Sequence, residues 1–552
     1  MDRPELAASA ARIIEDIQES NFASIELVVW HEAAAAGPAP AAGPAWRRKL
    51  EILRDPARRQ QVLFALYSKW DRRRGPAPSP DEPVDCGPWL EKVPSLRVRP
   101  EGKRFVHRFR AEDLAEIARH DLDVILRFGF NILRGGILRA ARYGLWSFHH
   151  GDNDAYRGGP ALFWEVVEQN PESGVILQVL EEALDDGVVL SKSVFPSEPG
   201  LSWSRNRFGP YWASTHFVIE RLWQLHNYGW EQVTAQATKS GQYRGRQAIY
   251  RAPTNSAVAR WLAPALVRKA ARRLTQGPAA NHWKTALRRL PAAGSAIAAP
   301  LDLREFHWLE SPSGVFWADP VLCEWQGQTH LFVEEYDYAR QRGRLAVAQV
   351  EDPRLLRFET CLDEPFHLSY PCVFTHGGQA YMIPESHAAG EVRLYAAGDY
   401  PLRWKLRKVL LKIPAVDTTP YYDGRKWWLF VTTCGPLGFC PSLLLFHADE
   451  LEGEWTYHPA NPLSGSLENV RNAGPVFESE GRVYRPSQSG RGGYGANFSL
   501  NEVERLNERE YRERRVSTTL PRGLPGMLGT HTYTRTAHWE AVDGVFRATR
   551  AG

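Results

Sequence analysis

The second half of the chain repeats a short pattern about every fifty residues. Each clear copy begins with a proline in an apolar stretch and continues through a glycine turn into a second apolar stretch. The four prolines are Pro320, Pro371, Pro420 and Pro475, spaced by 51, 49 and 55 residues. A weaker fifth copy runs from His531 to Phe546, with Asp543-Gly544 as its turn. A period of this length in short strands is typical of propeller blades. We therefore expect an all-β five-bladed propeller over residues 280–552.

Length and composition set the outer limits. The chain has 552 residues, which is enough for about two to four domains. No run of apolar residues approaches the length of a transmembrane helix, and the N-terminus lacks the basic and apolar regions of a secretory signal. The six cysteines are scattered, as in proteins of a reducing compartment. These features predict a cytoplasmic protein, with peripheral membrane attachment left open.

Residues 1–230 alternate helical and strand-like segments. The pattern predicts helices over residues 4–20, 55–74, 137–143 and 161–169, and strands over 145–149, 174–179 and 187–193. Strands that alternate with helices in this way are typical of an α/β domain. We expect a mostly parallel sheet in this first domain.

Residues 231–279 form a basic segment that we expect to be a helical connector. From Gln232 to Leu301 the chain has no Asp or Glu, although it has twelve Lys and Arg residues there. Three binding roles stay open beside that of a solvated linker. The segment could hold a phosphorylated substrate, lie on an anionic membrane surface or bind nucleic acid. Internal Gly and Pro, and the lack of an aromatic ladder, argue against nucleic acid.

A histidine and an aspartate end two predicted strands of the first domain, where they could form an oriented acid–base pair. The motifs around them are Ser147-Phe148-His149, Arg157-Gly158-Gly159-Pro160 and Leu184-Asp185-Asp186-Gly187. In order and spacing they resemble the 10-formyltetrahydrofolate-dependent formyltransferases. The pattern of that family is Asn-x-His, then Arg-Gly-x-x-Pro, then Leu-Asp-x-Gly. The resemblance covers about residues 100–195.

The resemblance implies a Rossmann-type formyltransferase domain that transfers a formyl group from 10-formyltetrahydrofolate to an amine. It implies that His149 donates a hydrogen bond to the oxyanion and helps to move the amine proton, and that Asp185 orients His149. It also implies that Arg157 and Gly158 bind substrate. The residues implied on the cofactor side are Phe128, Gly129, Asn131, Ile132 and Leu184.

The chain departs from the family pattern in two places. Ser147 stands where the family has an asparagine that helps to hold the oxyanion, and loss of one such donor costs about 10²–10³ in rate. We therefore expect slow, altered or lost transfer chemistry, with Ser147 as the weaker donor. The family also begins with a strand before its first helix, whereas this chain starts at the helix. Either Met1 is not the natural start, which we favour, or the sheet lacks a strand.

The repeat region resembles the five-bladed propellers of some glycoside hydrolases. It is more similar to the N-terminal module of plant glucosamine inositolphosphorylceramide transferases and of bacterial formyltransferase fusions. Asp319, Glu385 and Asp417 lie at blade positions that face a propeller axis, so we expect them to converge. Glycoside hydrolysis needs two carboxylates, with Asp319 as base and Glu385 as acid. Glycan binding without cleavage is the alternative that we favour.

The combined reading is a formyltransferase-like enzyme whose propeller binds a sugar-containing acceptor. The expected acceptor is an amino sugar on a nucleotide or lipid carrier. One rival is a binding or scaffold protein whose transferase fold has lost activity, and the other is a glycoside hydrolase that acts through the propeller. His150, Asp152 and Asp154 are spaced like turn residues rather than metal ligands, and we expect no metal.

Overall fold

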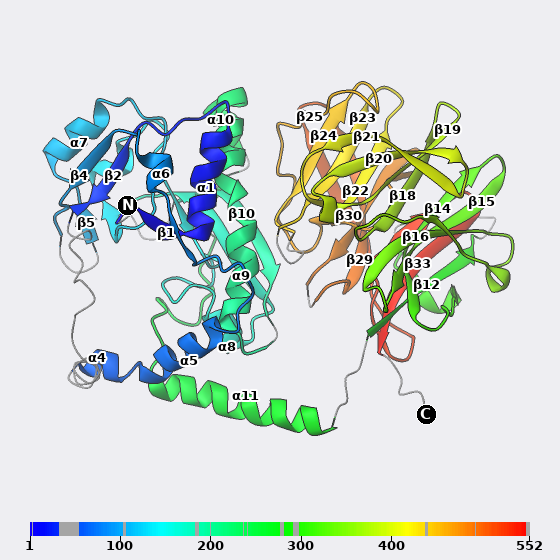
Figure 1. The fold of residues 1–552 in the computed structure, drawn as a ribbon, viewed down its shortest axis with the longest axis horizontal. Coiled ribbons are helices and arrows are strands. Elements are labelled where there is room, and N and C mark those ends of the chain that lie inside the picture. Colours follow the sequence, from blue (N-terminus) through cyan, green and yellow to red (C-terminus); the bar gives the residue numbers. More distant parts are fainter. Residues whose placement is uncertain are drawn as a thin grey trace. The chain divides into compact units, whose positions relative to one another are not determined.

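The chain forms two compact units, Met1–Leu274 and Thr275–Gly552. The computed structural model describes residues 1–2, 4–32, 55–102, 106–182, 187–198, 200–235, 237–239, 241–275, 281–290, 297, 299–435, 440–491 and 493–547. Figure 1 shows helices and strands mixed in the first unit, and strands throughout the second. The division counts most of the predicted connector, residues 231–279, with the first unit.

The main sheet of the first unit has the strand order β11-β10-β9-β8-β6. Its strands are β6 (Ile125–Leu126), β8 (Leu145–His149), β9 (Glu172–Val179), β10 (Val188–Pro196) and β11 (Thr238–Lys239). Among them only β6 and β8 pair in parallel, and the other three pairs are antiparallel. The prediction of a mostly parallel sheet is therefore wrong here. The segment between β9 and β10 is too short for the crossover that a parallel pair requires.

Three two-stranded sheets complete the strands of the first unit. β2 (Val28–His31) pairs in parallel with β4 (Ser95–Val98), and β5 (Val106–Arg108) pairs in parallel with β7 (Ile132–Arg134). β1 (Glu5–Ala7) pairs antiparallel with β3 (Pro83–Asp85). Parallel pairing in the described part of this unit thus occurs in these two small sheets and in the β6–β8 pair at one edge of the main sheet.

The described helices of the first unit include some within predicted segments, where they are shorter than predicted, and others in segments where no helix was predicted. They are α1 (Ala8–Glu19), α4 (Pro56–Arg59), α5 (Val62–Arg72), α6 (Gly87–Leu90), α7 (Ala111–Ala118), α8 (Trp164–Glu168), α9 (Trp203–Ala213), α10 (His216–Ala235) and α11 (Asn255–Thr275). The helix predicted over residues 55–74 is two helices. The one predicted over 137–143 is a 3-10 turn, η1 (Gly136–Arg139). No helix in the described ranges has the length and apolar character needed to cross a bilayer.

Five antiparallel sheets in succession make up the second unit. Blade one contains β14 (Val315–Trp325), β15 (Gln328–Asp337), β16 (Arg342–Gln349) and β17 (Glu359–Leu362). Blade two contains β18 (Ser369–His376), β19 (Gln379–Glu385), β20 (Val392–Asp399) and β21 (Arg403–Leu411). Blade three contains β22 (Ala415–Tyr422), β23 (Trp427–Thr433), β24 (Leu443–Ala448) and β25 (Thr456–Tyr457). These three sheets are the first three predicted repeats.

Blades four and five complete the ring. Blade four contains β26 (Arg471–Asn472), β27 (Phe477–Ser479), β28 (Arg482–Ser489), β29 (Asn497–Leu506) and β30 (Tyr511–Thr519). Blade five contains β12 (Asn281–Arg289), β13 (His307–Trp308), β31 (Met527–Gly529), β32 (Tyr533–Arg535) and β33 (Trp539–Arg547). Strands from both ends of the unit share blade five, because β12 pairs antiparallel with β33 along its whole length. The expected five-bladed propeller is therefore present, closed by a strand that the repeat did not reveal.

Hydrogen bonds near the inner strands join each blade to the next. Between blades one and two, Tyr370 N donates to Asp319 Oδ2 (3.1 Å). Between blades two and three, the Tyr370 hydroxyl and Thr419 Oγ1 form a hydrogen bond of 2.8 Å. Asn472 Nδ2 donates to Asp417 O (2.8 Å) between blades three and four. Tyr533 N donates to the carbonyl of Ala473 (2.7 Å) between blades four and five. Leu322 N donates to Thr534 Oγ1 (3.2 Å) and closes the ring.

Five buried apolar clusters lie at the five blade interfaces. One contains Phe332 of blade one and Met382 of blade two, and the next contains Ile383 of blade two and Leu429 of blade three. The other three join blades three and four, four and five, and five and one. Burial of apolar side chains between sheets stabilises the ring, so the propeller is held together from blade to blade around its axis.

The first strands of blades one to three each contain a bulge at the same place. The ladder shifts register at Asp319-Pro320, at Tyr370-Pro371 and at Asp417-Thr418. Asp319, Tyr370 and Asp417 have φ values of 49°, 42° and 48°, a left-handed backbone that turns these side chains away from the regular alternation. Pro420, aligned with Pro320 and Pro371 in the sequence, lies two residues beyond the equivalent position, so that alignment is wrong for blade three.

Candidate functional site

The predicted catalytic residues of the first unit lie at the end of β8. Ser147 and His149 are two residues apart on this strand, so their side chains point to the same face. His149 Nε2 lies 2.8 Å from the carbonyl oxygen of Tyr156. Because a carbonyl only accepts, Nε2 carries the proton of a neutral ring and Nδ1 is its basic nitrogen. Asp185 and Leu184 lie outside the described residues, so the His149–Asp185 pair stays a prediction.

Arg127 brings a positive charge to Ser147, a role that the sequence motifs did not reveal. Its Nε donates to Ser147 Oγ at 3.0 Å, and its Nη1 donates to the carbonyl of Asn131, also at 3.0 Å. Ser147 is buried, whereas Arg127 is half-buried. A guanidinium beside a hydroxyl offers strong, charge-assisted hydrogen bonds to an oxygen that gains negative charge. Arg127 therefore places a positive charge directly beside Ser147.

Gln178 is the second residue that the motifs missed. It is the direct cross-strand partner of Ser147 in the β8–β9 ladder, so both side chains lie on one face of the sheet. The Gln178 side chain is buried, and its Oε1 has no hydrogen-bond partner. A Cβ on Gly187 would lie 3.2 Å from this oxygen. A buried orphan acceptor is costly to keep, and a polar residue within the apolar stretch 175–179 was the signal that could have found it.

The residues predicted to bind the cofactor do not gather around one cavity. Phe128 lines a cavity of about 660 Å³, whereas Asn131, Ile132 and Gly129 are not among its lining residues. Asn131 Nδ2 instead lies 3.2 Å from His107 Nε2. Ile132 pairs with Val106 in the β5–β7 ladder.

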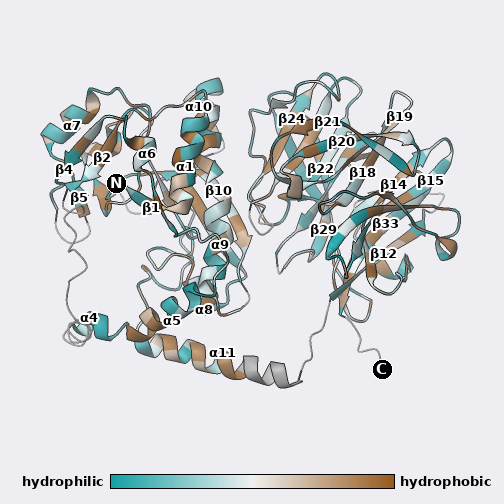
Figure 2. Cartoon of the chain, viewed as in Figure 1, coloured by the Kyte–Doolittle hydropathy of each residue, from teal (hydrophilic) through white to brown (hydrophobic). Residues whose placement is uncertain are grey.

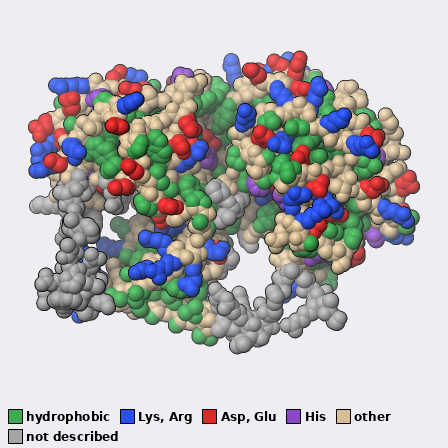
Figure 3. Space-filling model, in the orientation of Figure 1, with side chains coloured by type: hydrophobic (Ala, Val, Ile, Leu, Met, Phe, Trp, Pro, Cys, Tyr) green, Lys and Arg blue, Asp and Glu red, His purple; other side chains and the backbone are tan. Residues whose placement is uncertain are grey.

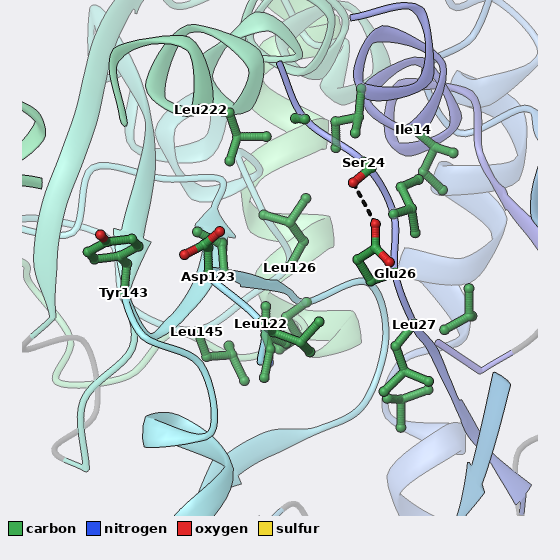
Figure 4. A pocket seen from close by; sticks show the side chains of 18 of the residues that line it. Ile14, Ser24, Glu26, Leu27, Leu122, Asp123, Leu126, Tyr143, Leu145 and Leu222 are labelled. Carbon is green, nitrogen blue, oxygen red and sulfur yellow. Dashed lines mark hydrogen bonds between the residues drawn. The ribbon is translucent and has the colours of Figure 1, made fainter. Parts of the chain in front are cut away.

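The cavity has a largely apolar wall that is built from several elements. Figure 4 shows leucines from separate segments of the chain turned toward it, among them Leu122, Leu126, Leu145 and Leu222. Residues of both β2 and β6 line it. The ammonium of Met1 donates to the carbonyl of Val29 (2.6 Å). The expectation of a further strand in this domain stays a prediction.

Arg157 and Gly158 lie on a loop that the segment around Tyr250 holds in place. Tyr250 N donates to the carbonyl of Arg157 (2.7 Å), and Gly159 N donates to that of Tyr250 (3.0 Å). A Cβ on Gly158 would lie 2.3 Å from the Tyr250 carbonyl oxygen, so only glycine allows this approach. The Arg157 guanidinium stacks 4.5 Å from the ring centre of Tyr243.

In the second unit, the three predicted carboxylates converge near the propeller axis. Arg471 of β26 forms ion pairs with Asp417 and with Glu385, with 3.5 Å between Arg471 Nη2 and Glu385 Oε2. Asp319 accepts hydrogen bonds from Tyr370 N and from Thr532 Oγ1, both at 3.1 Å. Asp319, Glu385 and Asp417 are all buried. The predicted convergence is therefore present, and the side chain that joins two of the three carboxylates is an arginine that the sequence reading did not select.

Asp543 was expected in a turn but lies buried within β33. Its Oδ1 accepts from the backbone N–H groups of His531 and Thr532 at 3.0 Å each, and its Oδ2 accepts from Asp319 N at 3.1 Å. His531 Nδ1 lies 2.6 Å from the same Oδ2. The ligand atoms of Asp319, His531 and Asp543 lie within 4.8 Å of one another. The trio could hold a metal ion by this spacing, and Asp543 also accepts several protein hydrogen bonds, so it has a structural role as well.

Two glutamates at equivalent strand positions differ in protonation. Burial acts to raise the pKa of Glu385, but the hydrogen bond with His387 (2.8 Å) and the charge of Arg471 bring that pKa down to about 2. Burial and the charges of Asp319 and Glu385 raise the pKa of Glu334 well above its usual range. The lowered pKa of Glu385 favours its ionised form at neutral pH, whereas the raised pKa of Glu334 favours a neutral carboxyl group; burial raises the pKa values of Asp417 and Asp319 as well.

His367 lies beside Glu334 at the margin of the carboxylate cluster. Its Nδ1 accepts from Gly343 N (2.9 Å), so the proton of the neutral ring is on Nε2, which lies 3.6 Å from Glu334 Oε1. At the rim, Tyr494 is exposed, and Arg471 stacks 4.9 Å from the centre of its ring. An aromatic ring beside carboxylates and an arginine is typical of sites that bind sugars or other polar ligands.

Comparison with known proteins supports both parts of the chain. The family model for the N-terminal part of glucosamine inositolphosphorylceramide transferase 1 matches residues 291–533. Glucosamine inositolphosphorylceramide transferase 1 of Oryza sativa subsp. japonica is 37% identical over 206 residues, which are 36% of this chain and 27% of that protein. The Arabidopsis thaliana protein of the same name is 34% identical over 218 residues, or 38% of this chain and 28% of that protein. The chain thus spans about a quarter of the length of these relatives.

A second set of relatives consists of formyltransferases. Methionyl-tRNA formyltransferase of Prochlorococcus marinus is 36% identical over 136 residues, which are 23% of this chain and 37% of that protein. The resemblance of the chain to formyltransferases and to the plant transferase module is therefore confirmed.

Solved structures of glycoside hydrolases also match part of the chain. The α-L-arabinofuranosidase of Podospora anserina, in complex with cellotriose, has 12% sequence identity and a TM-score of 0.31, and covers 43% of this chain and 92% of its own. The GH43_1 enzyme from Xanthomonas citri complexed with xylose has 12% identity and a TM-score of 0.33, and covers 44% and 89%.

Proposed function

We propose that the first unit transfers a formyl group from 10-formyltetrahydrofolate to an amine, and that the propeller binds the sugar part of the acceptor. The acceptor in this proposal is an amino sugar on a nucleotide or lipid carrier. The observation that carries it is the grouping of Ser147, His149 and Arg127 at the end of β8, in a chain with methionyl-tRNA formyltransferases among its relatives. The plant transferases similar to the propeller region support a sugar-related role for it.

The buried side-chain oxygen of Gln178 is the feature of the site that fits a folate. This oxygen accepts no hydrogen bond within the protein, and a pterin ring carries N–H donors that suit it. Phe128, at the edge of the apolar cavity, is the cofactor-side candidate that offers an aromatic contact. When bound, 10-formyltetrahydrofolate supplies an electrophilic formyl carbon.

The protein side chains would then act on the amine and on the formyl oxygen. His149 Nδ1 takes up the proton that the amine nitrogen loses as its bond to the formyl carbon forms. Arg127 and Ser147 donate hydrogen bonds to the formyl oxygen as negative charge develops on it. His149 then returns the proton to the nitrogen that leaves, so protons and electron pairs balance. Asp185, at the position that the family resemblance gives it, would favour the protonated form of His149 while the ring holds the proton.

Glycan binding without cleavage is the role that the propeller geometry favours. Arg471 pairs with both Asp417 and Glu385, and the lowered pKa of Glu385 leaves it without the proton that an acid needs. Hydrolysis would have to use Asp319 as the base and a carboxyl group other than that of Glu385 as the acid. If glycan cleavage is observed and Asp319→Asn abolishes it, the hydrolase function replaces the binding function.

Formyl transfer is tested with the full chain, 10-formyltetrahydrofolate and a panel of nucleotide-linked amino sugars. We expect acceptor-dependent release of tetrahydrofolate that His149→Ala reduces by at least about 10²-fold. His307→Ala, an exposed histidine in the second unit, is the matched control and keeps wild-type turnover. Unchanged turnover in His149→Ala would remove His149 from the mechanism. Folate binding without turnover of any amine would favour the binding-protein alternative instead.

A further inference from the structure

The outer face of α5 carries a stripe of exposed large apolar side chains. Leu63, Leu66 and Trp70 are 40%, 60% and 48% exposed, and their spacing of three and four residues places them on one side of the helix. The opposite side is already used for packing. The Tyr67 hydroxyl donates to the carbonyl of Leu201 (2.7 Å), and the buried Asp71 accepts from Ser204 N (2.6 Å). The exposed stripe is therefore surplus to the fold of this unit.

α11 adds further exposed apolar side chains. Leu266 and Val267 are 52% and 69% exposed. Its opposite side packs inward through the buried Val258 and Ala265. Hydrophobic segments are visible along both α5 and α11 in Figure 2.

The start of α11 is fixed to the start of α5 through Asn255. Asn255 Oδ1 accepts from Leu63 N (2.9 Å), and Asn255 Nδ2 donates to the carbonyl of Arg59 (2.8 Å). The rings of Tyr67 and Trp261 pack edge to face, with centres 5.2 Å apart. The two helices therefore move as one element, and we name it the α5–α11 platform.

Exposed cations lie on and beside the helix that carries the apolar stripe; among them Arg58 pairs with Asp55 (3.4 Å), and Arg74 stacks 4.5 Å from the ring centre of Trp70. The exposed basic residues on α4, on α5 and just beyond it are Arg58, Arg59, Lys69, Arg72, Arg73 and Arg74. Asp71 faces inward, so it adds no negative charge to the outer face. In the part of the chain that the structure describes, Lys69, Arg72 and Arg73 form no ion pair with a carboxylate. Figure 3 shows Lys and Arg side chains close to hydrophobic ones along the lower edge of this unit, where Figure 1 places α5 and α11.

We propose that the α5–α11 platform binds the surface of an anionic lipid bilayer, with Leu63, Leu66, Trp70, Leu266 and Val267 inserted among the headgroups. Exposed apolar side chains ringed by Lys and Arg are typical of helices that lie in the membrane interface. Nucleic acid would complement the positive charge of the platform, but it offers no apolar environment in which the exposed side chains of Leu66 and Val267 could be buried. A protein partner with a carboxylate surface also matches the charge alone. The platform is independent of the proposed formyl transfer, because none of its residues is assigned to that chemistry.

Co-sedimentation of the full chain with vesicles tests the proposal. One set of vesicles is pure phosphatidylcholine, and the other also contains about 30% phosphatidylserine. Each set is tested at a low and at a high salt concentration, which differ by roughly tenfold. We expect sedimentation with the anionic vesicles at low salt, at least about tenfold less with the neutral ones, and a marked loss at high salt. Absence of binding to anionic vesicles at low salt would overturn the proposal.

Two variants separate the apolar and the charged contributions. Leu66→Ser/Trp70→Ser removes the exposed apolar contact, and Lys69→Gln/Arg72→Gln/Arg73→Gln removes charge. We expect each to lower the bound fraction severalfold while circular dichroism and melting stay unchanged, since these side chains are exposed. The matched controls lie in the second unit. They are Leu355→Ser, at a leucine that is 76% exposed, and Arg403→Gln/Arg425→Gln/Arg509→Gln at exposed arginines.

Two further results would contradict a lipid partner. If the charge variant loses vesicle binding but the apolar variant binds like the wild type, the apolar stripe has no part in it. If light scattering shows a dimer that Leu66→Ser/Trp70→Ser converts to a monomer, a second copy of the chain covers the stripe instead.

Discussion

At the scale of single residues, Ser147 is the position on which the proposed chemistry of the first unit depends. A hydroxyl replaces an amide there, yet Arg127 donates to that hydroxyl and Gln178 lies directly across the ladder. In the proposed mechanism, Arg127 and Ser147 together take the place of the one asparagine of the family pattern. In this proposal the site is a rearranged set of donors rather than a depleted one.

Arg127→Met tests this arrangement. It keeps most of the side-chain volume and removes the charged donor, so we expect kcat of formyl transfer to fall by about 10²–10³, with a smaller change in KM. Arg119→Met, at an arginine paired only with Glu116 on the surface, is the control and keeps wild-type kinetics. A kcat unchanged in Arg127→Met would show that Ser147 acts without it.

Glu385 makes the stability of the propeller depend on pH. Its pKa falls from 4.5 to about 2 on folding, because His387 and Arg471 outweigh the effect of burial. A carboxylate with a lowered pKa stabilises the fold above its unfolded pKa, and this contribution disappears as the pH falls through the folded value. We expect the contribution of Glu385 to the free energy of unfolding to be lost between pH 4.5 and 2. Urea titrations at several pH values should show a shallower decline in Glu385→Gln, and parallel curves for the two proteins would contradict this.

At the scale of strands and loops, close approaches within blade one leave no room for a side chain at Gly343. A Cβ there would lie 2.4 Å from the carbonyl oxygen of Leu368 and 2.7 Å from Glu334 Oε1. We expect Gly343→Ala to destabilise the second unit by about 1–3 kcal/mol. Gly398→Ala, in β20 with its nearest atom 3.7 Å away, is the control. Thermal melts of both variants decide the point, and equal melting temperatures would refute it.

The repeat predicted the blades but not the details of their inner strands. Proline spacing located four blades, yet Pro420 follows the bulge of blade three instead of forming it, because Thr418 takes the place that proline has in blades one and two. Asp543-Gly544 reads as a turn, since that dipeptide is common in turns, although pairing with β12 extends β33 through it. β12 itself was hidden because its partner strand is more than 200 residues away in the sequence.

The site residues also divide into those that the repeat pattern could predict and those that depend on contacts between strands. Asp319, Glu385 and Asp417 could be predicted because they stand at recurring positions of the repeat. Arg471 and His531 could not, because each occurs in a single blade and has its role only through contacts with the others. In the first unit, the Ser147–His149 pair could be read from one strand, whereas Arg127 and Gln178 required knowledge of which strands pair.

At the scale of the whole molecule, the two compact units should unfold separately. We expect two calorimetric transitions for the full chain and one for a fragment of residues 275–552, since each unit has its own buried core. A fragment that starts at residue 300 lacks β12 and leaves one side of β33 unpaired. We expect that fragment to be unfolded or aggregated. A cooperative melt of the shorter fragment at the temperature of the longer one would contradict the role of β12 in closure.

The shared fifth blade also determines how such a propeller domain can be fused to, or inserted into, other proteins. Asn281 and Arg547 face each other at one end of the β12–β33 pair, so the chain comes into the ring and leaves it at neighbouring points. A gene segment that encodes the whole ring can therefore be spliced into a surface loop, or joined to either end of an unrelated enzyme, without breaking a blade. A segment cut at the bounds of the matching family region, residues 291–533, would leave out β12 and β33 and carry over an open ring.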